Sequence, residues 1–334
     1  MTKAATWALS AGVLLFIGVL VSQGLPAVVA TLALAGWGLL WVALFHLVPL
    51  ALDATAIRVL FPGTLRGALR RGAARGAMLD AVLARWAGES ANSLMPGGQL
   101  GGPLLMARHL AQRGMPMQQA AAAITVSTTL QTIAQITFAL VGVALLGVQA
   151  THVSQNALRV SALIASGFLA VQVGGFYWMQ RRGFFSKVMR AVNRFAGKRD
   201  WSKWMSQAEA IDLAVSETYG RLGPVAASFL LSLLGWLVGS GEVYLILELI
   251  HQPAGWVNCV LLESLGQAIR GAAFAIPGAL GVQEGGYLLL APLVGLPPDA
   301  ALALSLSKRA RELLLGLPGL FYLQLSSRGN AAAV

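Results

Sequence analysis

The sequence predicts an all-α, polytopic membrane protein, and three features of the chain support this fold class. Hydrophobic residues make up 57% of the 334 residues, and charged residues only 11%. Several apolar stretches are close to or above the ~20 residues that a helix needs to cross a bilayer. Two further apolar stretches are interrupted by glycine and proline. A water-soluble fold of this composition would lack the polar residues needed to cover its surface.

Six apolar stretches are predicted to cross the membrane completely. They comprise residues 7–23, 26–52, 118–148, 157–180, 222–250 and 300–325. The first stretch follows Lys3 and resembles the apolar part of a secretory signal, with Ala33-Leu34-Ala35 as a loose match to a cleavage site. We favour a membrane span, because the second stretch follows almost at once and leaves no mature polar domain.

The distribution of lysine and arginine predicts the side of the membrane that each loop faces, because cytoplasmic loops retain these residues. The basic residues before the first span, after the second and before the third are Lys3, Arg58, Arg66, Arg70, Arg71, Arg75, Arg108 and Arg113. Residues 181–221 carry nine more, whereas residues 149–156 and 251–256 carry none. Both termini are therefore expected in the cytoplasm, and the bacterial inner membrane is the expected location.

Two apolar segments, residues 76–112 and 257–298, lie between loops that face the same side of the membrane. Each segment must enter the bilayer and return, so both are predicted to be re-entrant, the first from the cytoplasmic side and the second from the opposite side. Half one (1–150) and half two (151–334, with the cytoplasmic loop 181–221) then have the same order of elements in opposite orientations. The sequence therefore predicts an inverted repeat of about six full spans and two re-entrant segments.

The two re-entrant segments share a sequence pattern. In half one Glu89-Ser90 precedes Pro96-Gly97-Gly98-Gln99-Leu100-Gly101-Gly102, and in half two Glu263-Ser264 precedes Pro277-Gly278-Ala279-Leu280-Gly281-Val282-Gln283-Glu284-Gly285-Gly286, with a different spacing. Proline and glycine interrupt a helix, and the N-terminus of the second half-helix then presents N–H groups that favour an anionic head group. The alternative is that these glycines only permit close packing of helices.

Charged residues at membrane depth are expensive and mark functional sites by default. Lys308, Arg309 and Arg311 are expected about 12 to 18 Å inside the last span, near the midplane. We expect these residues and Arg270 to bind a phosphate or another anion, whereas Glu89, Glu263 and Glu284 take protons or bind cationic parts of the head group. The corresponding stretch of half one offers only Ser127, Thr128 and Gln131. The alternative is that the charges pair with one another as structural ion pairs.

Residues 184–195 have the pattern of a basic amphipathic helix. Phe184 and other apolar residues recur at helical spacing, with Lys187, Arg190 and Arg194 between them. Such a helix is expected to lie on the inner leaflet and attract anionic lipids. The alternative is a helix packed against the bundle.

Several functional classes are not supported. Cys259 is the only cysteine, and the four histidines have no metal-binding spacing, so neither a metal site nor a cofactor is expected. No HExxH, GxSxG or DxxD motif indicates an enzyme. The formal net charge of +11 is distributed in short blocks between apolar spans, which indicates membrane topology rather than nucleic-acid binding.

At residues 88–102 and 277–286 the sequence resembles the flippase-like family that includes the transmembrane region of lysylphosphatidylglycerol synthases, and within it the hopanoid-biosynthesis-associated membrane proteins. The resemblance covers essentially the whole chain and implies a lipid-translocating domain without an aminoacyl-transferase domain. The motif residues that carry over are Glu89, Asn92, Pro96, Gly97, Gly98, Gly101, Gly102, Pro277, Gly278, Gly281, Glu284 and Gly285. Ala279 stands where many relatives have glycine.

These observations predict a lipid translocase that moves an amphipathic lipid, anionic or hopanoid-related, between leaflets. The expected substrate or translocation residues are Glu89, Asn92, Pro96, Gly97, Gly98, Gln99, Gly101, Gly102, Glu263, Arg270, Pro277, Gly278, Gly281, Gln283, Glu284, Lys308, Arg309 and Arg311. The alternatives are an intramembrane enzyme that modifies a lipid head group and a non-catalytic scaffold for lipid biosynthesis. Membrane lipids are the expected partners, and a homo-oligomer or an association with lipid-biosynthesis enzymes stays open.

Overall fold

The computed structural model describes residues 33–62, 74–95, 98–149, 171, 174–195, 202–273, 276 and 279–331, and its regular elements there are all helices. They are α3 (Gly38–Arg58), α5 (Ala74–Leu94), α6 (Gly98–Gln112), α7 (Met117–Gln149), α9 (Phe184–Phe195), α10 (Ser202–Gly220), α11 (Leu222–Leu249), α12 (Trp256–Ala272), α13 (Val282–Leu290), the short 3-10 helix η3 (Ala291–Val294) and α14 (Pro298–Ala331). Residues 174–181 are also helical. The predicted all-α class is confirmed for the part of the chain that the structure describes.

Three of these helices, at Gly38–Arg58, Met117–Val148 and Leu222–Leu249, are long and apolar enough to cross a membrane. They correspond to the spans predicted at 26–52, 118–148 and 222–250. The chain is therefore a multi-pass membrane protein. The span predicted at 7–23 and most of the span predicted at 157–180 lie outside the described residues.

The C-terminal boundary predicted for the second span, 26–52, was wrong, and its first residues, 26–32, lie outside the described residues. The backbone turns at Gly36, where φ is +44°, and α3 begins only after this turn. At the other end α3 continues through Asp53 to Arg58. A charged residue is tolerated inside this helix because Arg85 Nη2 lies 2.7 Å from Asp53 Oδ2.

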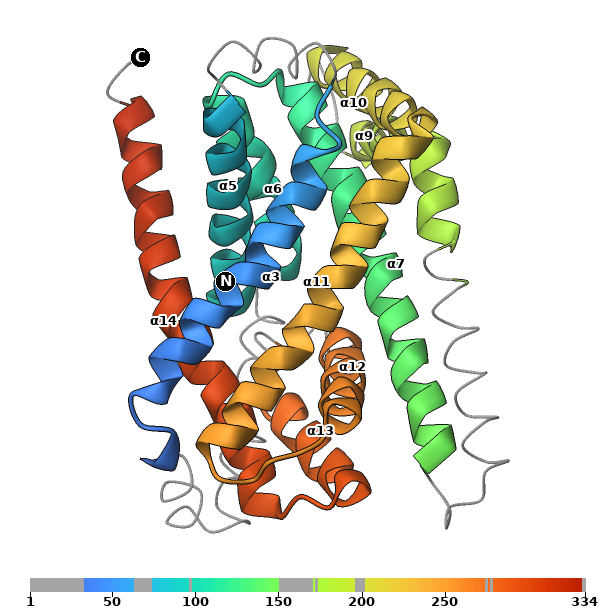
Figure 1. Cartoon of the computed structure of the whole chain (residues 1–334). Coiled ribbons are helices and arrows are strands. Elements are labelled where there is room, and N and C mark those ends of the chain that lie inside the picture. Colours follow the sequence, from blue (N-terminus) through green and yellow to red (C-terminus); the bar gives the residue numbers. More distant parts are fainter. Residues whose placement is uncertain are drawn as a thin grey trace.

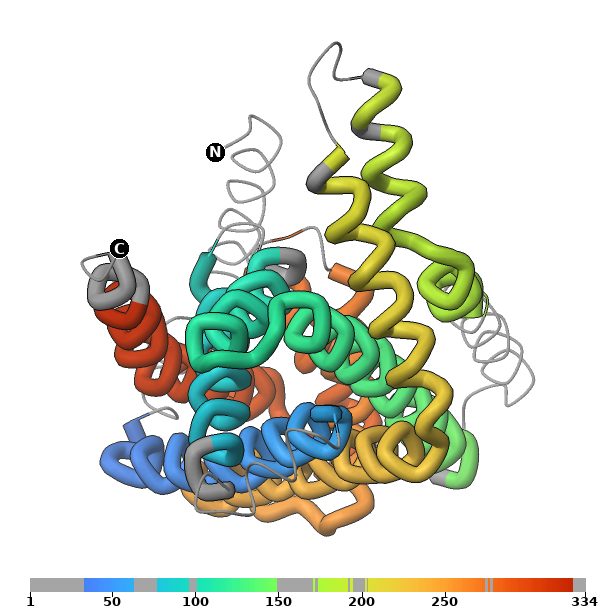
Figure 2. The backbone as a smooth tube through the Cα atoms, turned by 90° about the horizontal axis from the view of Figure 1, so that it is seen from above, coloured from blue at the N-terminus to red at the C-terminus, as the bar shows by residue number. Residues whose placement is uncertain are grey.

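The long helices form a bundle around two short helical pairs. Helices α3, α7, α11 and α14 run along the bundle, while α5 and α6 lie in its upper half and α12 and α13 in its lower half (Figure 1). Seen from above, α3 and α11 lie side by side (Figure 2). They approach closely at Gly241, where an added Cβ would lie 2.7 Å from Phe45 Cζ. Small residues permit such close contacts between helices in a membrane.

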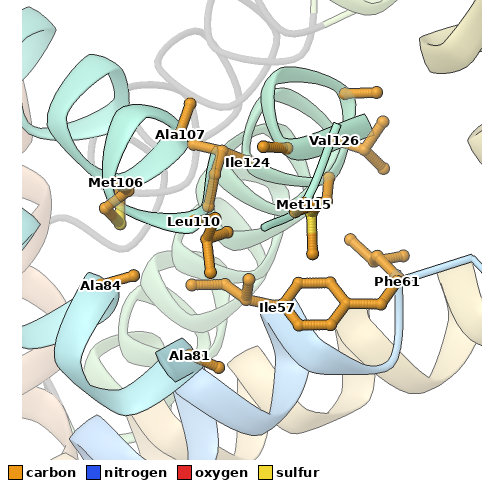
Figure 3. Packing of buried hydrophobic residues seen from close by; sticks show 14 of the residues in the cluster. Ile57, Phe61, Ala81, Ala84, Met106, Ala107, Leu110, Met115, Ile124 and Val126 are labelled. Atoms are coloured by element: carbon orange, nitrogen blue, oxygen red, sulfur yellow. The ribbon is translucent and has the colours of Figure 1, made fainter. Parts of the chain in front are cut away.

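Two hydrophobic clusters occupy the two ends of the bundle. Figure 3 shows the upper cluster, in which Ile57 and Phe61 of α3 and the following turn pack against Leu110 of α6 and Ile124 of α7. The lower cluster joins α3, α11, α12, α13 and α14, for example through Val42, Ile246, Leu261, Tyr287 and Leu304. On α3 the lower cluster ends at Val42 and the upper one begins at Ala54. The polar residues described below lie between them.

Helices α9 and α10 extend beyond the bundle on one side (Figure 2). The Asp212 carboxylate of α10 accepts hydrogen bonds from the backbone N–H groups of Phe185 (3.0 Å) and Ser186 (2.8 Å), which fixes the first turn of α9. The predicted helix at 184–195 is confirmed. It packs against α10, and its basic residues Lys187, Arg190 and Arg194 are exposed, so its predicted position on the inner leaflet stays a prediction.

Candidate functional site: a charged cluster at the centre of the bundle

Six helices bring charged and polar side chains together between the two hydrophobic clusters. We call this group the central cluster. Its members are His46 and Asp53 of α3, Arg85 and Glu89 of α5, Glu242 of α11, Glu263 and Arg270 of α12, Gln283 and Glu284 of α13, and Lys308, Arg309, Arg311 and Glu312 of α14. All are buried or half-buried. Both sequence halves contribute.

Helix α14 supplies the largest share of the charge. Lys308 Nζ lies 2.8 Å from Glu263 Oε2 and 3.3 Å from Glu242 Oε1, and all three side chains are at most 4% exposed. Arg309 Nε lies 3.1 Å from Glu284 Oε1. These contacts are ion pairs of the kind that the sequence offered as the alternative to substrate binding. Removing one partner of such a pair leaves an uncompensated charge, which is strongly destabilising.

Three guanidinium groups surround the carboxylate of Glu312. Arg270 forms an ion pair with Oε1, Arg309 Nη1 lies 3.2 Å from Oε2, and Arg311 Nη2 lies 3.7 Å from Oε1. Arg309 Nη2 is buried and has no hydrogen-bond partner among the described residues. Three cationic groups therefore share the Glu312 carboxylate, and Arg309 has a donor left for another acceptor.

The first half reaches the cluster through α3 and α5. Asp53 Oδ2 accepts hydrogen bonds from Arg85 Nη2 (2.7 Å) and from Gln131 Nε2 of α7 (2.6 Å). Arg85 Nη2 also lies 3.7 Å from Glu89 Oε2, one helical turn further along α5. Gln131, which the sequence marked only as a polar counterpart of the charges in half two, thus contacts the cluster directly.

His46 joins the two halves. Its Nε2 lies 2.8 Å from Glu89 Oε1 and its Nδ1 lies 2.8 Å from Glu242 Oε2. In the sequence His46 is one of four scattered histidines, and no motif indicates a role for Asp53, Arg85 or Glu242. A usable signal was present: His46 and Asp53 are two helical turns apart and therefore lie on one face of α3.

The turn before α13 is capped by a carboxylate from the first turn of α13. Gly281 has a φ of +76°, and its N–H donates to Glu284 Oε2 at 2.7 Å. Glu284 is fully buried. One of the N–H groups predicted to face an anionic head group is therefore bonded to a protein carboxylate. Ala279 has a φ of +50°, a backbone region that favours glycine.

The pair α5–α6 is held by close contact rather than by charge. Asn92 Oδ1 accepts a hydrogen bond from the backbone N–H of Gly102 at 3.2 Å. A Cβ at Gly102 would lie 2.7 Å from Gly88 O, so the two helices can approach only because this residue is glycine. At Asn92 and Gly102 the structure thus agrees with the packing alternative.

The predicted site residues fall into three groups. Those in the central cluster are Glu89, Glu263, Arg270, Gln283, Glu284, Lys308, Arg309 and Arg311; those at or near the two turns are Asn92, Gly98, Gln99, Gly101, Gly102 and Gly281. Pro96, Gly97, Pro277 and Gly278 lie outside the described residues.

Two cavities adjoin the cluster. One of about 10 Å³ lies between α3, α5 and α14 and is lined by Glu89, Arg311 and Glu312 together with Trp86 and Ser90. The other, of about 460 Å³, lies on the α3–α11 face and is lined by Phe45, Leu237, Val238, Gly241, Tyr244, Leu245 and Trp256. Phe45 and Gly241 directly precede His46 and Glu242 in the sequence. The cavity lining and the charged cluster therefore share helices α3 and α11.

The comparisons with known proteins identify one family. The family described as lysylphosphatidylglycerol synthase TM region matches residues 5–319. No curated protein and no solved structure matches the chain. The family match agrees with the resemblance seen in the two motifs and gives no link to hopanoid biosynthesis. Because the match covers most of the chain, the protein belongs to the family of the lysylphosphatidylglycerol synthase TM region.

Proposed function

We propose that the protein is a lipid translocase that moves an amphipathic lipid between leaflets, with the head group passing through the central cluster. One observation carries the proposal: side chains of six helices from both sequence halves bury a charged cluster midway along a membrane bundle. Ionisable residues at this depth are costly and usually line a substrate or ion pathway. Family membership supports an involvement with lipids.

We further propose that α5–α6 and α12–α13 are the two re-entrant segments of an inverted repeat. Helix α5 ends at Leu94 and α6 begins at Gly98, while α12 ends at Ala272 and α13 begins at Val282. The pairs lie at opposite ends of the bundle (Figure 1). Each pair sends charged side chains to the same cluster, as expected for a binding site between two inverted repeats.

The surroundings of Glu312 favour an anionic group on the lipid. Arg270, Arg309 and Arg311 converge there, and Arg309 Nη2 has no acceptor among the described residues. Because these bases already contact carboxylates, a phosphate would exchange with Glu312 or Glu284 rather than fill a vacant positive site. A hopanoid-related lipid with a polar side chain is the second candidate cargo.

The apolar cavity on the α3–α11 face suits the acyl chain of the same lipid. Its lining is almost entirely apolar, and two of its residues, Phe45 and Gly241, directly precede His46 and Glu242 in the sequence. A lipid whose tail occupies this cavity would therefore have its head group within reach of the cluster if α3 and α11 separate. Movement of one helical repeat against the other is the usual basis of alternating access.

The orientation that we propose follows the basic residues. Arg58, at the C-terminal end of α3, and Arg221, which donates to Phe61 O at 3.0 Å, lie at the same end of the bundle. Helices α9 and α10 are also at this end (Figure 1). We assign it to the cytoplasm of a bacterial cell, with the protein in the inner membrane and both chain termini inside.

Reconstitution into liposomes tests the function. Fluorescent analogues of phosphatidylglycerol, phosphatidylethanolamine and a hopanoid are placed in one leaflet, and their appearance in the other is followed against protein-free vesicles. Accelerated movement of at least one analogue is expected, with phosphatidylglycerol fastest. Lack of acceleration for every analogue contradicts translocation. Mass spectrometry of the recovered lipids detects the enzyme alternative as an altered head group, and a scaffold would change neither readout.

A further inference from the structure

His46 contacts three charged groups on three other helices. Its Nε2 lies 2.8 Å from Glu89 Oε1 on α5, and its Nδ1 lies 2.8 Å from Glu242 Oε2 on α11. Arg311 of α14 places Nη1 2.7 Å from Nε2 and 2.9 Å from Nδ1. The imidazole thus lies where α3, α5, α11 and α14 meet.

These contacts fit two different protonation states of the ring. An imidazolium has two N–H donors, so it donates to Glu89 and Glu242 at the same time and offers Arg311 no acceptor. A neutral imidazole has one donor and one acceptor, so it donates to only one carboxylate and its other nitrogen needs a donor, for which Arg311 Nη1 is close by. Each state therefore finds its partners already within hydrogen-bond distance.

The charge of the central cluster also depends on this ring. The cluster contains six carboxylates, on Asp53, Glu89, Glu242, Glu263, Glu284 and Glu312, and five other bases, on Arg85, Arg270, Lys308, Arg309 and Arg311. A protonated His46 makes the two signs equal. The neighbours that would compete for or repel its proton are Asp53 on its own helix, Arg85 beside Glu89, and Lys308 and Arg311 beside Glu242.

We propose that His46 is a proton-binding site, and that proton uptake and release there control the contact of α3 with Glu89 of the α5–α6 pair. The proposal rests on the proposed lipid translocation and names the proton as the ion coupled to it. With the proton bound, the ring links Glu89 of the α5–α6 pair to Glu242 of α11. Release of the proton removes one of these hydrogen bonds, and Arg311 donates to the vacated nitrogen. Because the linked state holds one more proton, acid favours it.

Glu89 provides the route by which the proton leaves. Its side chain is 25% exposed, against 2% for Glu242. Glu89 also lines the cavity of about 10 Å³ between α5 and α14, which is close to the space that one water molecule needs. The N–H bond at Nε2 breaks, its electron pair stays on the ring nitrogen, and the proton passes to Glu89 Oε1 and then to water.

Two measurements on one set of variants test this assignment. The first is the rate of phosphatidylglycerol movement in liposomes between about pH 5.5 and about pH 8, the range in which histidine normally changes charge. The second is the distance between spin labels at Leu79→Cys on α5 and Leu289→Cys on α13, both exposed, in a Cys259→Ala background. The second readout requires no lipid movement.

The variants are His46→Gln, which binds no proton, and His46→Lys, which keeps a positive charge between the two carboxylates. His251→Asn is the control, because His251 is exposed just after α11 and asparagine tolerates its φ of +56°. In wild type and the control, rate and label distance should both change with pH. Both should become independent of pH in the two His46 variants, with the Lys variant fixed at the wild-type distance seen in acid.

The possible outcomes separate this assignment from the proposed function. A label distance that still follows pH in both His46 variants overturns the proton site, whatever the lipid assay gives. A wild-type distance that does not change over this pH range overturns it as well. A distance that loses its pH dependence only in the His46 variants, without lipid movement in wild type, retains the proton site and contradicts translocation.

Discussion

Lys308 of α14 and Glu263 of α12 form an ion pair of 2.8 Å between Nζ and Oε2, in which neither side chain is more than 4% exposed. The pair joins the last helix of the chain to the helical pair that precedes it. Glu242 of α11 lies 3.3 Å from the same Nζ, so one ammonium group holds two carboxylates. The Lys308 ammonium group thus joins α11, α12 and α14.

Replacing Lys308 by methionine is expected to lower the free energy of unfolding by about 3 to 5 kcal/mol, because Glu242 and Glu263 lose their shared buried cation. Unfolding in mixed micelles measures this. The exposed Lys187 provides the control, and its replacement by methionine should change stability by no more than about 0.5 kcal/mol. Adding Glu263→Gln to Lys308→Met should recover part of the loss, and strict additivity of the two changes would contradict a direct pair.

Gly319 permits close contact between α14 and α5. A Cβ there would lie 2.9 Å from Ser90 Cβ and even closer to its hydroxyl, whereas nothing lies within 4 Å of a Cβ at Gly239 in α11. Gly319→Ala should therefore destabilise the protein by about 1 to 3 kcal/mol through overpacking. Gly239→Ala should be neutral or stabilising by up to about 1 kcal/mol, because alanine favours helix. Equal effects of the two changes would argue against the helix contact.

Ala279 is expected to be better replaced by glycine. Its φ of +50° costs an L residue about 1 to 2 kcal/mol, while glycine adds about 0.4 to 1 kcal/mol of chain entropy to the unfolded state. The net expectation for Ala279→Gly is a gain of a few tenths to about 1 kcal/mol. Ala301→Gly, inside α14, serves as the comparison and should cost about 1 kcal/mol. Thermal unfolding of both variants gives the sign, and a loss at Ala279 would be the opposite of this expectation.

The basic face of α9 should bind anionic lipid surfaces. Replacing Lys187, Arg190 and Arg194 by glutamine, one at a time, should each weaken binding of a peptide covering residues 184–195 to phosphatidylglycerol vesicles by ~1 kcal/mol. The differences should shrink as salt is added, because screening shortens the reach of these charges. Binding that is insensitive to all three changes would contradict a lipid-binding role for the basic face of α9 and leave its contact with Asp212 of α10 as the described interaction.

Hydropathy predicted the spans at α7 and α11 closely, because both are long helices of high mean hydropathy. It failed at the end of α3, where a lone Asp53 indicates a boundary unless Arg85 is known to lie opposite. Residue type predicted eight members of the central cluster. His46, Asp53, Arg85 and Glu242 were missed, because their role depends on partners on other helices, at sequence separations that no local pattern encodes.

The sequence did not decide whether the buried charges bind a substrate or form ion pairs with one another. It offered binding and mutual neutralisation as alternatives for the buried charges, and the contacts show that every base of the central cluster touches a carboxylate. Only the structure distinguishes Arg309, whose Nη2 has no hydrogen-bond partner among the described residues, from Lys308, which lies between two carboxylates. The side of the membrane that each loop faces was predicted from the loop charges alone, because this prediction depends on local composition and on no tertiary contact.

The central claim is that a lipid head group passes through the charged cluster. The most direct measurement is the rate of phosphatidylglycerol movement in liposomes for wild type, Arg309→Gln in the cluster and Arg108→Gln on the exposed face of α6, with folding checked for each. We predict that Arg309→Gln slows movement about tenfold, the effect of about 1.4 kcal/mol, and that Arg108→Gln leaves it unchanged. Equal rates in all three folded proteins would contradict the claim.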